Sequence, residues 1–322
     1  MYYIGVDIGG MSIKTGIVSL DGRILYTSVI KTEKISAKLQ IEKLGEDIIK
    51  LLNENCIKKE EILGIGVGCP GAINSKLGKV HYSSNLKWTD FPLKDLLEKY
   101  TGIKVRVAND ADAATIGEII FGVAKDYSNV IMLTIGTGVG GGIVINKKLY
   151  LGTNGVVAEL GHITLRTGGL ECGCGRRGCF EQYASATALI RQTKEAMQKN
   201  KNSKMWEYAE NDIENVDGKT AFLASKCGDK TARKVVEKYV SYLSEGILDY
   251  CNIFRPDAFV LGGGISKEGK YLTDKIVKYL DEHDYGYPGS PRSEVLTASL
   301  GNDAGIIGAA SLIAEGDFEW KQ

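Results

Sequence analysis

The chain has 322 residues, of which 40 are Lys or Arg and 40 are Asp or Glu, so its formal net charge is zero. This length fits about two domains and can bury a core without disulfide bonds. The 43% apolar and 25% charged residues exclude a disordered chain, and the balanced charge predicts neither a nucleic acid nor an anionic membrane as partner.

The first part of the chain predicts alternating strands and helices. Three apolar, β-rich segments come first, and Asp21-Gly22 between the second and the third is typical of a hairpin turn. The expected strands are residues 2–8, 13–20, 23–30, 62–68 and 105–108, and the expected helices are residues 37–55, 92–100 and 110–121.

The second part has the same character, so two α/β halves are expected, each opening on two strands around a glycine turn. The expected strands are residues 130–135, 143–145 and 258–261, and the expected helices are residues 181–199, 231–252, 273–280 and 304–314. A turn is expected at 136–142, an irregular glycine-rich segment at 150–180 and a surface excursion at 199–219.

Targeting signals are not expected. No apolar run approaches the ~20 residues needed to span a bilayer. The opening MYYIGVDIGG has neither a basic region nor a small-residue cleavage site, so a cytoplasmic location is expected. Seven cysteines, an odd number, argue against a disulfide framework.

The first glycine segment lies between two expected strands and reads DIGGMSIK from residue 7. Glycines let backbone N–H groups approach a phosphate, and Asp7 at a strand end could hold a hydrated Mg²⁺. The Walker spacing is missing. A plain glycine turn beside an exposed Asp7 is the equally weighted alternative.

Two further glycine segments follow strands. Residues 136–142 hold five glycines among seven residues, more than a hairpin needs, and Thr137 adds a hydroxyl, so a phosphate cradle is favoured. Gly262-Gly263-Gly264 follows a buried strand. It suits a simple strand-to-helix turn, and by itself it is only weak support for a flat surface that binds a nucleoside.

A metal site is the strongest purely chemical prediction. His162 is followed by Cys172, Cys174 and Cys179, and glycines between the cysteines allow sharp turns. One histidine and three cysteines form a closed tetrahedral zinc site of the structural kind. Three free thiols in a loop are the weaker alternative.

Asn109-Asp110 stands between a strand and a helix. A carboxylate there can accept a proton from a hydroxyl, although Asn and Asp are also favoured helix caps, and the local sequence favours the cap. Glu159 and Glu181 flank the expected zinc loop and could bind sugar hydroxyls or be ordinary solvated glutamates.

Taken together, the sequence resembles the ROK family of sugar kinases and sugar-sensing regulators, and within it the ATP-dependent glucokinase branch. The resemblance covers essentially the whole chain. It rests on residues 7–14, Pro70-Gly71, Asn109-Asp110, 131–162, 172–181 and 262–266.

The resemblance implies an actin-like (ribonuclease H-like) ATPase fold, with two α/β domains around a cleft. Residues 1–118 and 300–322 are assigned to an N-terminal small domain. Residues 119–299 are assigned to a larger C-terminal domain with a zinc-binding loop. It also implies a homodimer or homotetramer.

The implied activity is transfer of phosphate from ATP to a hexose, most simply to the 6-hydroxyl of glucose, with Mg²⁺ and a structural Zn²⁺. Asp110 is then the catalytic base. Five residues bind the sugar: Gly71, Asn109, Glu159, His162 and Glu181. ATP and Mg²⁺ are held by Asp7, Gly9, Gly10, Ser12, Lys14, Gly136, Thr137, Gly138, Gly262, Gly263 and Gly264.

Three residues depart from the family pattern. Met11 replaces a threonine, and a thioether cannot donate a hydrogen bond to a phosphate. Ala158 replaces a glycine before Glu159. Asp112 replaces an asparagine and adds a charge near Asp110, which would raise the pKa of Asp110.

Alternatives remain within and outside this class. The acceptor could be N-acetylmannosamine, N-acetylglucosamine or another hexose. A sugar-responsive regulator is disfavoured, since such relatives carry a DNA-binding domain before the first strand, which here starts at residue 2. A catalytically weak sugar binder is suggested only by Met11.

Overall fold

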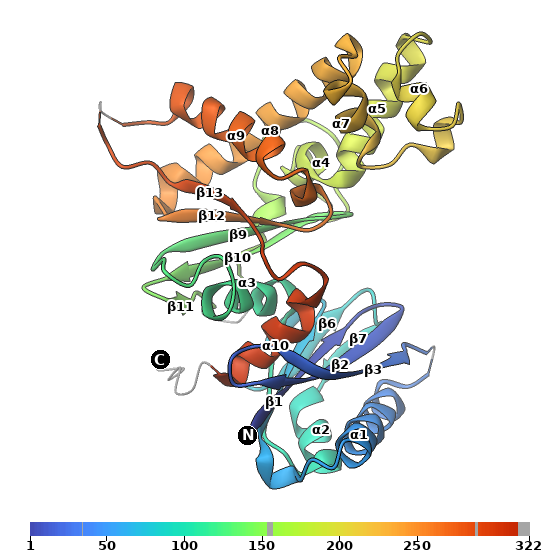
Figure 1. The fold of residues 1–322 in the computed structure, drawn as a ribbon, viewed down its shortest axis with the longest axis vertical. Helices are drawn as coiled ribbons and strands as arrows, with labels where there is room; N and C mark the ends of the chain where they lie inside the picture. The colour runs from blue at the N-terminus through green and yellow to red at the C-terminus, as the bar shows by residue number, and fades with distance from the viewer. Residues whose placement is uncertain (34, 153–156, 287–288, 315–322) are drawn as a thin grey trace. The chain divides into compact units, whose positions relative to one another are not determined.

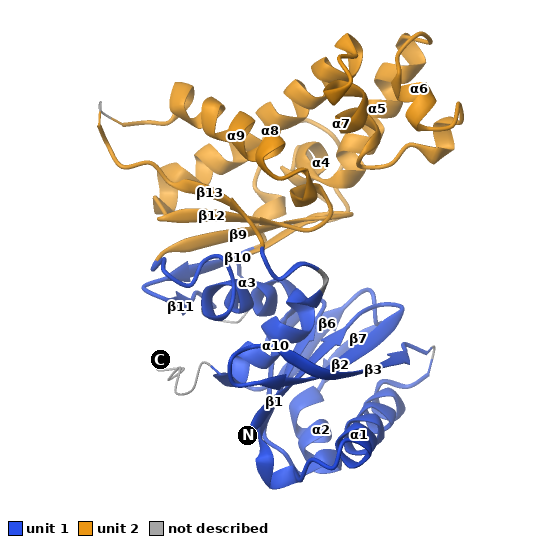
Figure 2. Ribbon diagram, in the orientation of Figure 1, with its two compact units in different colours: residues 1–128, 142–158, 299–322 blue, residues 129–141, 159–298 orange. Residues whose placement is uncertain are grey.

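The computed structural model describes residues 1–33, 35–152, 157–286 and 289–314 (Figure 1). Its contacts divide the chain into two compact units. Unit 1 comprises residues 1–128, 142–158 and 299–322, and unit 2 comprises residues 129–141 and 159–298 (Figure 2). The domain boundaries expected from the sequence, after residues 118 and 299, stay a prediction. Residues 315–322 of the expected returning segment lie outside the described residues.

Unit 1 contains a five-stranded mixed sheet in the order β3-β2-β1-β4-β8. Its strands are β1 (Tyr2–Ile8), β2 (Ser12–Ser19), β3 (Ile24–Lys31), β4 (Ile62–Cys69) and β8 (Val105–Asn109). β1, β4 and β8 run parallel, with Asp7 beside Gly68 and Cys69 beside Asn109. The carboxyl ends of these strands therefore share one edge, which is where open α/β sheets bind ligands.

Two helices, α1 (Ala37–Glu54) and α2 (Leu93–Thr101), pack on the core of this sheet. Ser36 caps α1 by accepting a hydrogen bond from the backbone N–H of Leu39 at 3.3 Å. The apolar residues of α1 recur every three or four positions, and this stripe is buried: Ile41, Leu44, Ile48, Leu51 and Leu52.

The helix α10 (Ala304–Ala314) packs directly on the backbone of the same sheet. A Cβ atom on Gly5 would lie 1.9 Å from the carbonyl oxygen of Ile306, and one on Gly66 would lie 1.7 Å from that of Ala309. Only glycine permits this approach at these two paired positions of β1 and β4. The helix α3 (Asp110–Ile120) is equally close, since a Cβ atom on Gly117 would lie 2.8 Å from the Cα atom of Gly308.

A small three-stranded sheet in unit 1 was not predicted. Its strands are β5 (Ala72–Asn74), β6 (Lys79–Ser83) and β7 (Trp88–Phe91), in that order. Segments of three to five residues are too short to show a clear alternation of apolar and polar positions. Trp88 anchors the sheet in the core and lies against Phe91, with ring centroids 5.0 Å apart.

A second five-stranded mixed sheet has the order β11-β10-β9-β12-β13. Its strands are β9 (Val130–Ile135), β10 (Val139–Ile145), β11 (Lys148–Leu149), β12 (Ala258–Gly262) and β13 (Glu294–Thr297). β10 begins four residues before the expected strand, so the turn is only 136–138 and Gly140 to Gly142 belong to the strand. At Gly141 a Cβ atom would lie 2.3 Å from the carbonyl oxygen of Met132, so glycine here serves close packing.

The helices of unit 2 are α4 (Glu181–Ala184), α5 (Ala186–Lys199), α6 (Met205–Tyr208), α7 (Thr220–Lys226), α8 (Lys230–Phe254) and α9 (Lys270–His283) (Figure 1). The single helix expected at 181–199 is two helices. Ser185 is extended, with φ −75° and ψ 166°, and its side chain accepts from the backbone N–H of Ala188 to start α5. Among the described helices, none combines the length and apolar content needed to cross a membrane.

Candidate active site and metal cluster

The junction of β8 and α3 brings Asn109 and Asp110 to the carboxyl edge of the unit 1 sheet. Oδ1 of Asn109 accepts from the backbone N–H of Ala111 at 2.9 Å, so Asn109 is the helix cap. Oδ1 of Asp110 accepts from the same N–H at 2.9 Å. The cap expected from the local sequence is therefore present, and both Asn109 and Asp110 accept from its N–H.

Two carboxyl groups at this edge, those of Asp110 and Asp7, have raised pKa values. The pKa of Asp110 is raised, because the surrounding protein keeps water from its carboxylate and so disfavours the charge. Its backbone hydrogen bonds lower the pKa, but by less. Asp112, which is buried, is not a cause of this shift, contrary to the expectation from the sequence. Burial also raises the pKa of Asp7, an effect that Lys14 opposes and Asp110 adds to. Asp7, Lys14 and Asp110 are therefore one electrostatic cluster.

The first glycine loop has a fixed backbone. The N–H of Gly9 donates to the carbonyl of Ser12 at 2.9 Å, and Thr32 donates from Oγ1 to Gly9 at 2.7 Å and from its N–H to Met11 at 3.0 Å. Gly10 has open space around it. Met11 is 86% exposed, so its side chain is not part of the core of unit 1.

Gly71 is placed beside Asn109 by a strained turn. Its φ is +120°, and a Cβ atom would lie 2.3 Å from the carbonyl oxygen of Tyr82 in β6. Nδ2 of Asn109 donates to the carbonyl of Gly71 at 3.0 Å. The structure thus brings together two of the residues expected to bind sugar, and glycine is required at one of them.

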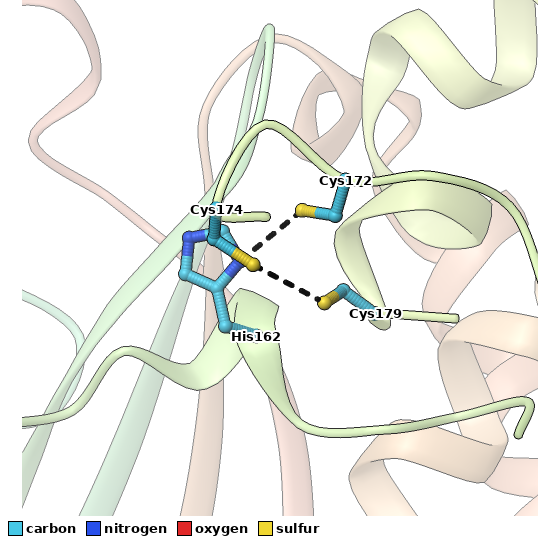
Figure 3. Close-up of side chains that lie close together, drawn as sticks. All are labelled: His162, Cys172, Cys174 and Cys179. Atoms are coloured by element: carbon cyan, nitrogen blue, oxygen red, sulfur yellow. Dashed lines mark hydrogen bonds between the residues drawn. The ribbon is translucent and has the colours of Figure 1, made fainter. Parts of the chain in front are cut away.

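In unit 2, His162 and the three cysteines form the Cys–His cluster (His162, Cys172, Cys174 and Cys179) shown in Figure 3. Their ligand atoms all lie within 4.8 Å of one another. Nδ1 of His162 is 3.5 Å from the sulfur of Cys172, and the sulfurs of Cys174 and Cys179 are 3.6 Å apart. The other ring nitrogen of His162, Nε2, is not used in these contacts.

The loop that carries the cysteines is built on two left-handed glycines. Gly175 has φ +86° and Gly178 has φ +80°, and a Cβ atom on Gly178 would lie 1.6 Å from the carbonyl oxygen of Arg166. Burial and the neighbouring thiols raise the pKa of Cys179 to about 12, whereas the backbone hydrogen bond from Arg176 lowers that of Cys174. A divalent cation among four such donors would favour the thiolates, so the donor set fits zinc.

Glu159 and Glu181 flank this loop. Glu159 is exposed and immediately precedes the short turn that ends at His162, whose N–H donates to the carbonyl of Glu159 at 2.9 Å. Glu181 opens α4, and its Oε2 accepts from the backbone N–H of Val139 at 3.0 Å. Ala158 has φ +58°, a left-handed conformation that costs an alanine about 1–2 kcal/mol and explains why a glycine suits this position.

The second glycine loop, residues 136–138, is held by the segment that joins α4 to α5. The N–H of Ala186 donates to the carbonyl of Gly136 at 2.9 Å. Oγ1 of Thr187 donates to the carbonyl of Thr137 at 2.8 Å. The sequence did not single out Thr187, because a threonine one turn into an expected helix carries no signal of its own.

The third glycine loop lies at the same sheet edge as the second. β9 and β12 are parallel neighbours, with Thr134 beside Gly262. Gly263 has φ +85°, and a Cβ atom there would lie 2.3 Å from the carbonyl oxygen of Ile135. Ser266 donates from Oγ to the carbonyl of Gly263 at 2.8 Å and fixes the turn.

Comparison with known proteins identifies the family of the chain. Residues 3–315 match the model of the ROK family. The glucokinase of Streptomyces coelicolor is 37% identical, over 98% of both chains, and that of Thermotoga maritima is 38% identical, over 97% of both. The xylose repressor of Bacillus subtilis is 30% identical, over 98% of this chain and 77% of the repressor.

A solved structure shows the same fold. The crystal structure of a ROK family glucokinase from Streptomyces griseus, in complex with glucose and AMPPNP, is 36% identical with a TM-score of 0.81. The alignment covers 98% of this chain and 100% of that chain. The two mixed sheets are therefore those of the actin-like ATPase fold. Because the family model spans nearly the whole chain and relatives share 37–38% of its residues, the protein belongs to the ROK family.

Proposed function

We propose that the protein is an ATP-dependent sugar kinase that transfers the γ-phosphate of ATP to the 6-hydroxyl of glucose. The observation that carries this proposal is the cluster of Asp110, Asp7 and Lys14 at the carboxyl edge of the unit 1 sheet. The identity of 37–38% to two glucokinases supports the same activity.

Asp110 acts as the general base. Its carboxylate accepts the proton of the sugar hydroxyl as that oxygen attacks the γ-phosphate, and the phosphate bond to the leaving ADP breaks. The raised pKa of Asp110 makes its carboxylate a stronger base than an ordinary carboxylate. Positioning and charge stabilisation supply most of the rate enhancement in phosphoryl transfer.

The other residues bind and orient. Asp7 holds hydrated Mg²⁺ at the end of β1. Sugar hydroxyls are bound by Gly71, Asn109, Glu159, His162 and Glu181. Phosphate and nucleoside contacts come from Gly9, Gly10, Ser12, Lys14, Gly136, Thr137, Gly138, Gly262, Gly263 and Gly264, chiefly through backbone N–H groups.

The Cys–His cluster holds a structural zinc ion in this proposal. Four protein donors leave no open position, so the ion supplies rigidity and no chemistry. With Nδ1 of His162 facing the cluster, Nε2 remains for a sugar hydroxyl. The ion therefore orients His162 and the neighbouring Glu159.

Three alternatives remain. A kinase for N-acetylmannosamine, N-acetylglucosamine or another hexose needs the same base and differs only around the acceptor sugar. The 30% identity to a xylose repressor supports a sugar-responsive regulator, and the exposed Met11 in the phosphate loop supports a sugar binder without turnover.

A substrate panel tests the proposal. ADP release is measured with Mg-ATP and a series of hexoses and N-acetylhexosamines, with Asp110→Asn as the blank. Turnover that is highest with glucose and absent in the variant supports the glucokinase. Turnover that is highest with a different sugar would change the proposed substrate and still support the proposed kinase activity. No turnover with any sugar, together with sugar binding by calorimetry, establishes the binding role instead.

Two features follow from the family resemblance and the use of ATP. We expect a homodimer or homotetramer, which light scattering after size-exclusion chromatography measures. We also expect the enzyme to act in the cytoplasm, because ATP is available there.

A further inference from the structure

One face of α8 contacts the backbone on both sides of the Cys–His cluster. Its contact residues are Tyr239, Tyr242, Gly246 and Tyr250, spaced three or four positions apart, so they form one stripe along the helix. The sequence predicted a helix over residues 231–252, and nothing in it singled out Gly246 or Tyr250.

Tyr250 holds the turn between Glu159 and His162. Its side chain is only 1% exposed, and its hydroxyl donates to the carbonyl oxygen of Leu160. Leu160 is the first residue of a three-residue 3₁₀ turn that ends at His162. So short a turn has little stability of its own, and its position depends on such external contacts.

Tyr239 holds the other side of the site. It is fully buried, and its hydroxyl donates to the carbonyl oxygen of Ala184 at 2.7 Å. Ala184 ends α4, a single turn of four residues that Glu181 opens. The hydroxyl therefore fixes the end of the helical turn whose beginning carries the Glu181 carboxylate.

The stripe also packs against the residue that precedes Glu181. A Cβ atom on Gly246 would lie 2.4 Å from the ring of Phe180, so only glycine lets this ring rest on α8. The ring of Tyr250 meets that of Phe180 edge-on, with centroids 6.4 Å apart and an interplanar angle of 74°. The rings of Tyr242 and Tyr183 are 5.1 Å apart.

Both hydroxyl groups act as donors. Burial raises the pKa of Tyr239 and of Tyr250 well above the ordinary value, so neither ionises at neutral pH. A phenylalanine keeps the ring and leaves the carbonyl of Leu160 or Ala184 without this hydrogen bond. An unpaired buried carbonyl is costly, so the short turn would move to recover a partner.

We propose that Tyr250 and Tyr239 are positioning residues for the phosphotransferase reaction: their hydroxyls set the backbone that presents Glu159 and His162 on one side and Glu181 on the other. This inference rests on the proposed function. Both tyrosines are buried, and their effect passes through the carbonyls of Leu160 and Ala184.

The test compares Tyr250→Phe and Tyr239→Phe with Tyr271→Phe. Tyr271 offers a matched control, because its hydroxyl forms a 2.9 Å hydrogen bond with Ser225 between α7 and α9. For each variant, KM for glucose, KM for ATP, kcat, zinc content and the thermal unfolding transition are measured. The same kinetics are run with deoxyglucoses that lack one hydroxyl each.

We expect KM for glucose to rise about tenfold in Tyr250→Phe and Tyr239→Phe, the size of effect that a small misplacement of ligand-binding groups produces. Zinc content and KM for ATP in Tyr250→Phe should match the wild type. The preference for glucose over the deoxyglucoses should shrink, because misplaced carboxylates no longer distinguish a hydroxyl from a hydrogen. Tyr271→Phe should leave all of these values unchanged.

An unchanged KM for glucose and an unchanged preference over deoxyglucoses in both variants would overturn the inference. Loss of zinc or of the cooperative unfolding transition would overturn it as well, since the hydroxyls would then maintain the fold and not the geometry of the site. A wild-type protein without turnover on any sugar refutes the proposed function itself, and the inference with it.

Discussion

The backbone N–H of Val139 donates to Oε2 of Glu181 at 3.0 Å. Val139 follows the second glycine loop, and a Cβ atom on Gly138 would lie 2.2 Å from the same carboxylate oxygen. The loop proposed to bind phosphate and the glutamate proposed to bind sugar are therefore one hydrogen-bonded structure within unit 2. A shift of Glu181 displaces the loop, so the two ligands are expected to influence each other's binding.

Asp110→Asn should abolish phosphate transfer and retain sugar binding. An amide cannot accept the proton of the hydroxyl, and loss of a general base lowers kcat by about 10²–10⁴-fold. The amide oxygen can still accept the hydrogen bond from Ala111, so the start of α3 is preserved. ADP release measures turnover, and calorimetry measures sugar affinity.

The matched control for this change is Asp126→Asn, an exposed carboxylate of the same unit, which should keep wild-type kinetics. Near-normal turnover in Asp110→Asn would show that another group is the base.

As the pH is lowered, kcat should fall, and the midpoint of this fall should lie at a higher pH than the pKa of an ordinary aspartate. The surrounding protein raises the pKa of Asp110, and the base is active only when it is deprotonated. Activity is therefore complete above the raised pKa and is lost as the pH falls through it. Stopped assays across the acid range measure this fall, with circular dichroism at each pH to show that the protein is folded. A fall centred near the ordinary value of 3.8 would contradict the raised pKa of this carboxyl.

Cys174→Ser should lose zinc and lower the sugar affinity about 10–100-fold, because a serine hydroxyl is a poor zinc ligand and the orientation of His162 depends on the ion. Elemental analysis measures the metal, and calorimetry measures the affinity. Cys56→Ser changes another exposed cysteine, outside the cluster, and should alter neither. Wild-type protein purified without a chelator and free of zinc would refute the metal site.

Met11→Thr should lower KM for ATP by about two- to tenfold. Its side chain is 86% exposed in the first glycine loop, and a hydroxyl there can donate to a phosphate, for about 0.5–1.5 kcal/mol. Steady-state kinetics with varied ATP measures the change. Leu77→Thr, at a 59% exposed position of the same unit, should have no effect. An unchanged KM in Met11→Thr would show that the side chain at this position does not reach the phosphates.

Glu118→Gln should lower the free energy of unfolding by about 1–3 kcal/mol. Glu118 is 1% exposed, and its carboxylate accepts from the N–H groups of Val123, Ser299 and Leu300 and from the hydroxyl of Ser299. In glutamine an NH2 group replaces one of the two carboxylate oxygens. This group is a donor and would face one of the donors that the oxygen accepted from. Chemical denaturation measures the loss, and Glu60→Gln, an exposed change, should produce none.

Long apolar elements were predicted well from the sequence. The strands at 2–8 and 130–135 and the helix at 304–314 match the structure at both ends. Their residues are buried continuously or with a regular period, so local pattern and tertiary environment agree. The Cys–His cluster was predicted for a similar reason, since its chemistry depends on residue types that the sequence shows directly.

Other features were not predicted from the local pattern. Ser185 interrupts an apparently continuous helical segment because its side chain caps α5. The cause of the raised pKa of Asp110 and the hydrogen bond from Tyr250 to Leu160 arise from the tertiary fold. The cap at Asn109 is local, and the sequence predicted it. Gly140 to Gly142 were expected in a turn, since glycine in a strand is recognised only when the neighbouring backbone is known.

Because α10 packs on Gly5 and Gly66, the sheet of unit 1 can be completed only after α10 has been synthesised. The sheet of unit 1 is made of residues from the first third of the chain, yet its glycine face is covered by residues 304–314. A ribosome therefore produces all of unit 2 before unit 1 receives its last layer. Until then the nascent sheet presents an uncovered apolar surface, which is a binding surface for chaperones, and a chain cut short before residue 304 would keep it permanently.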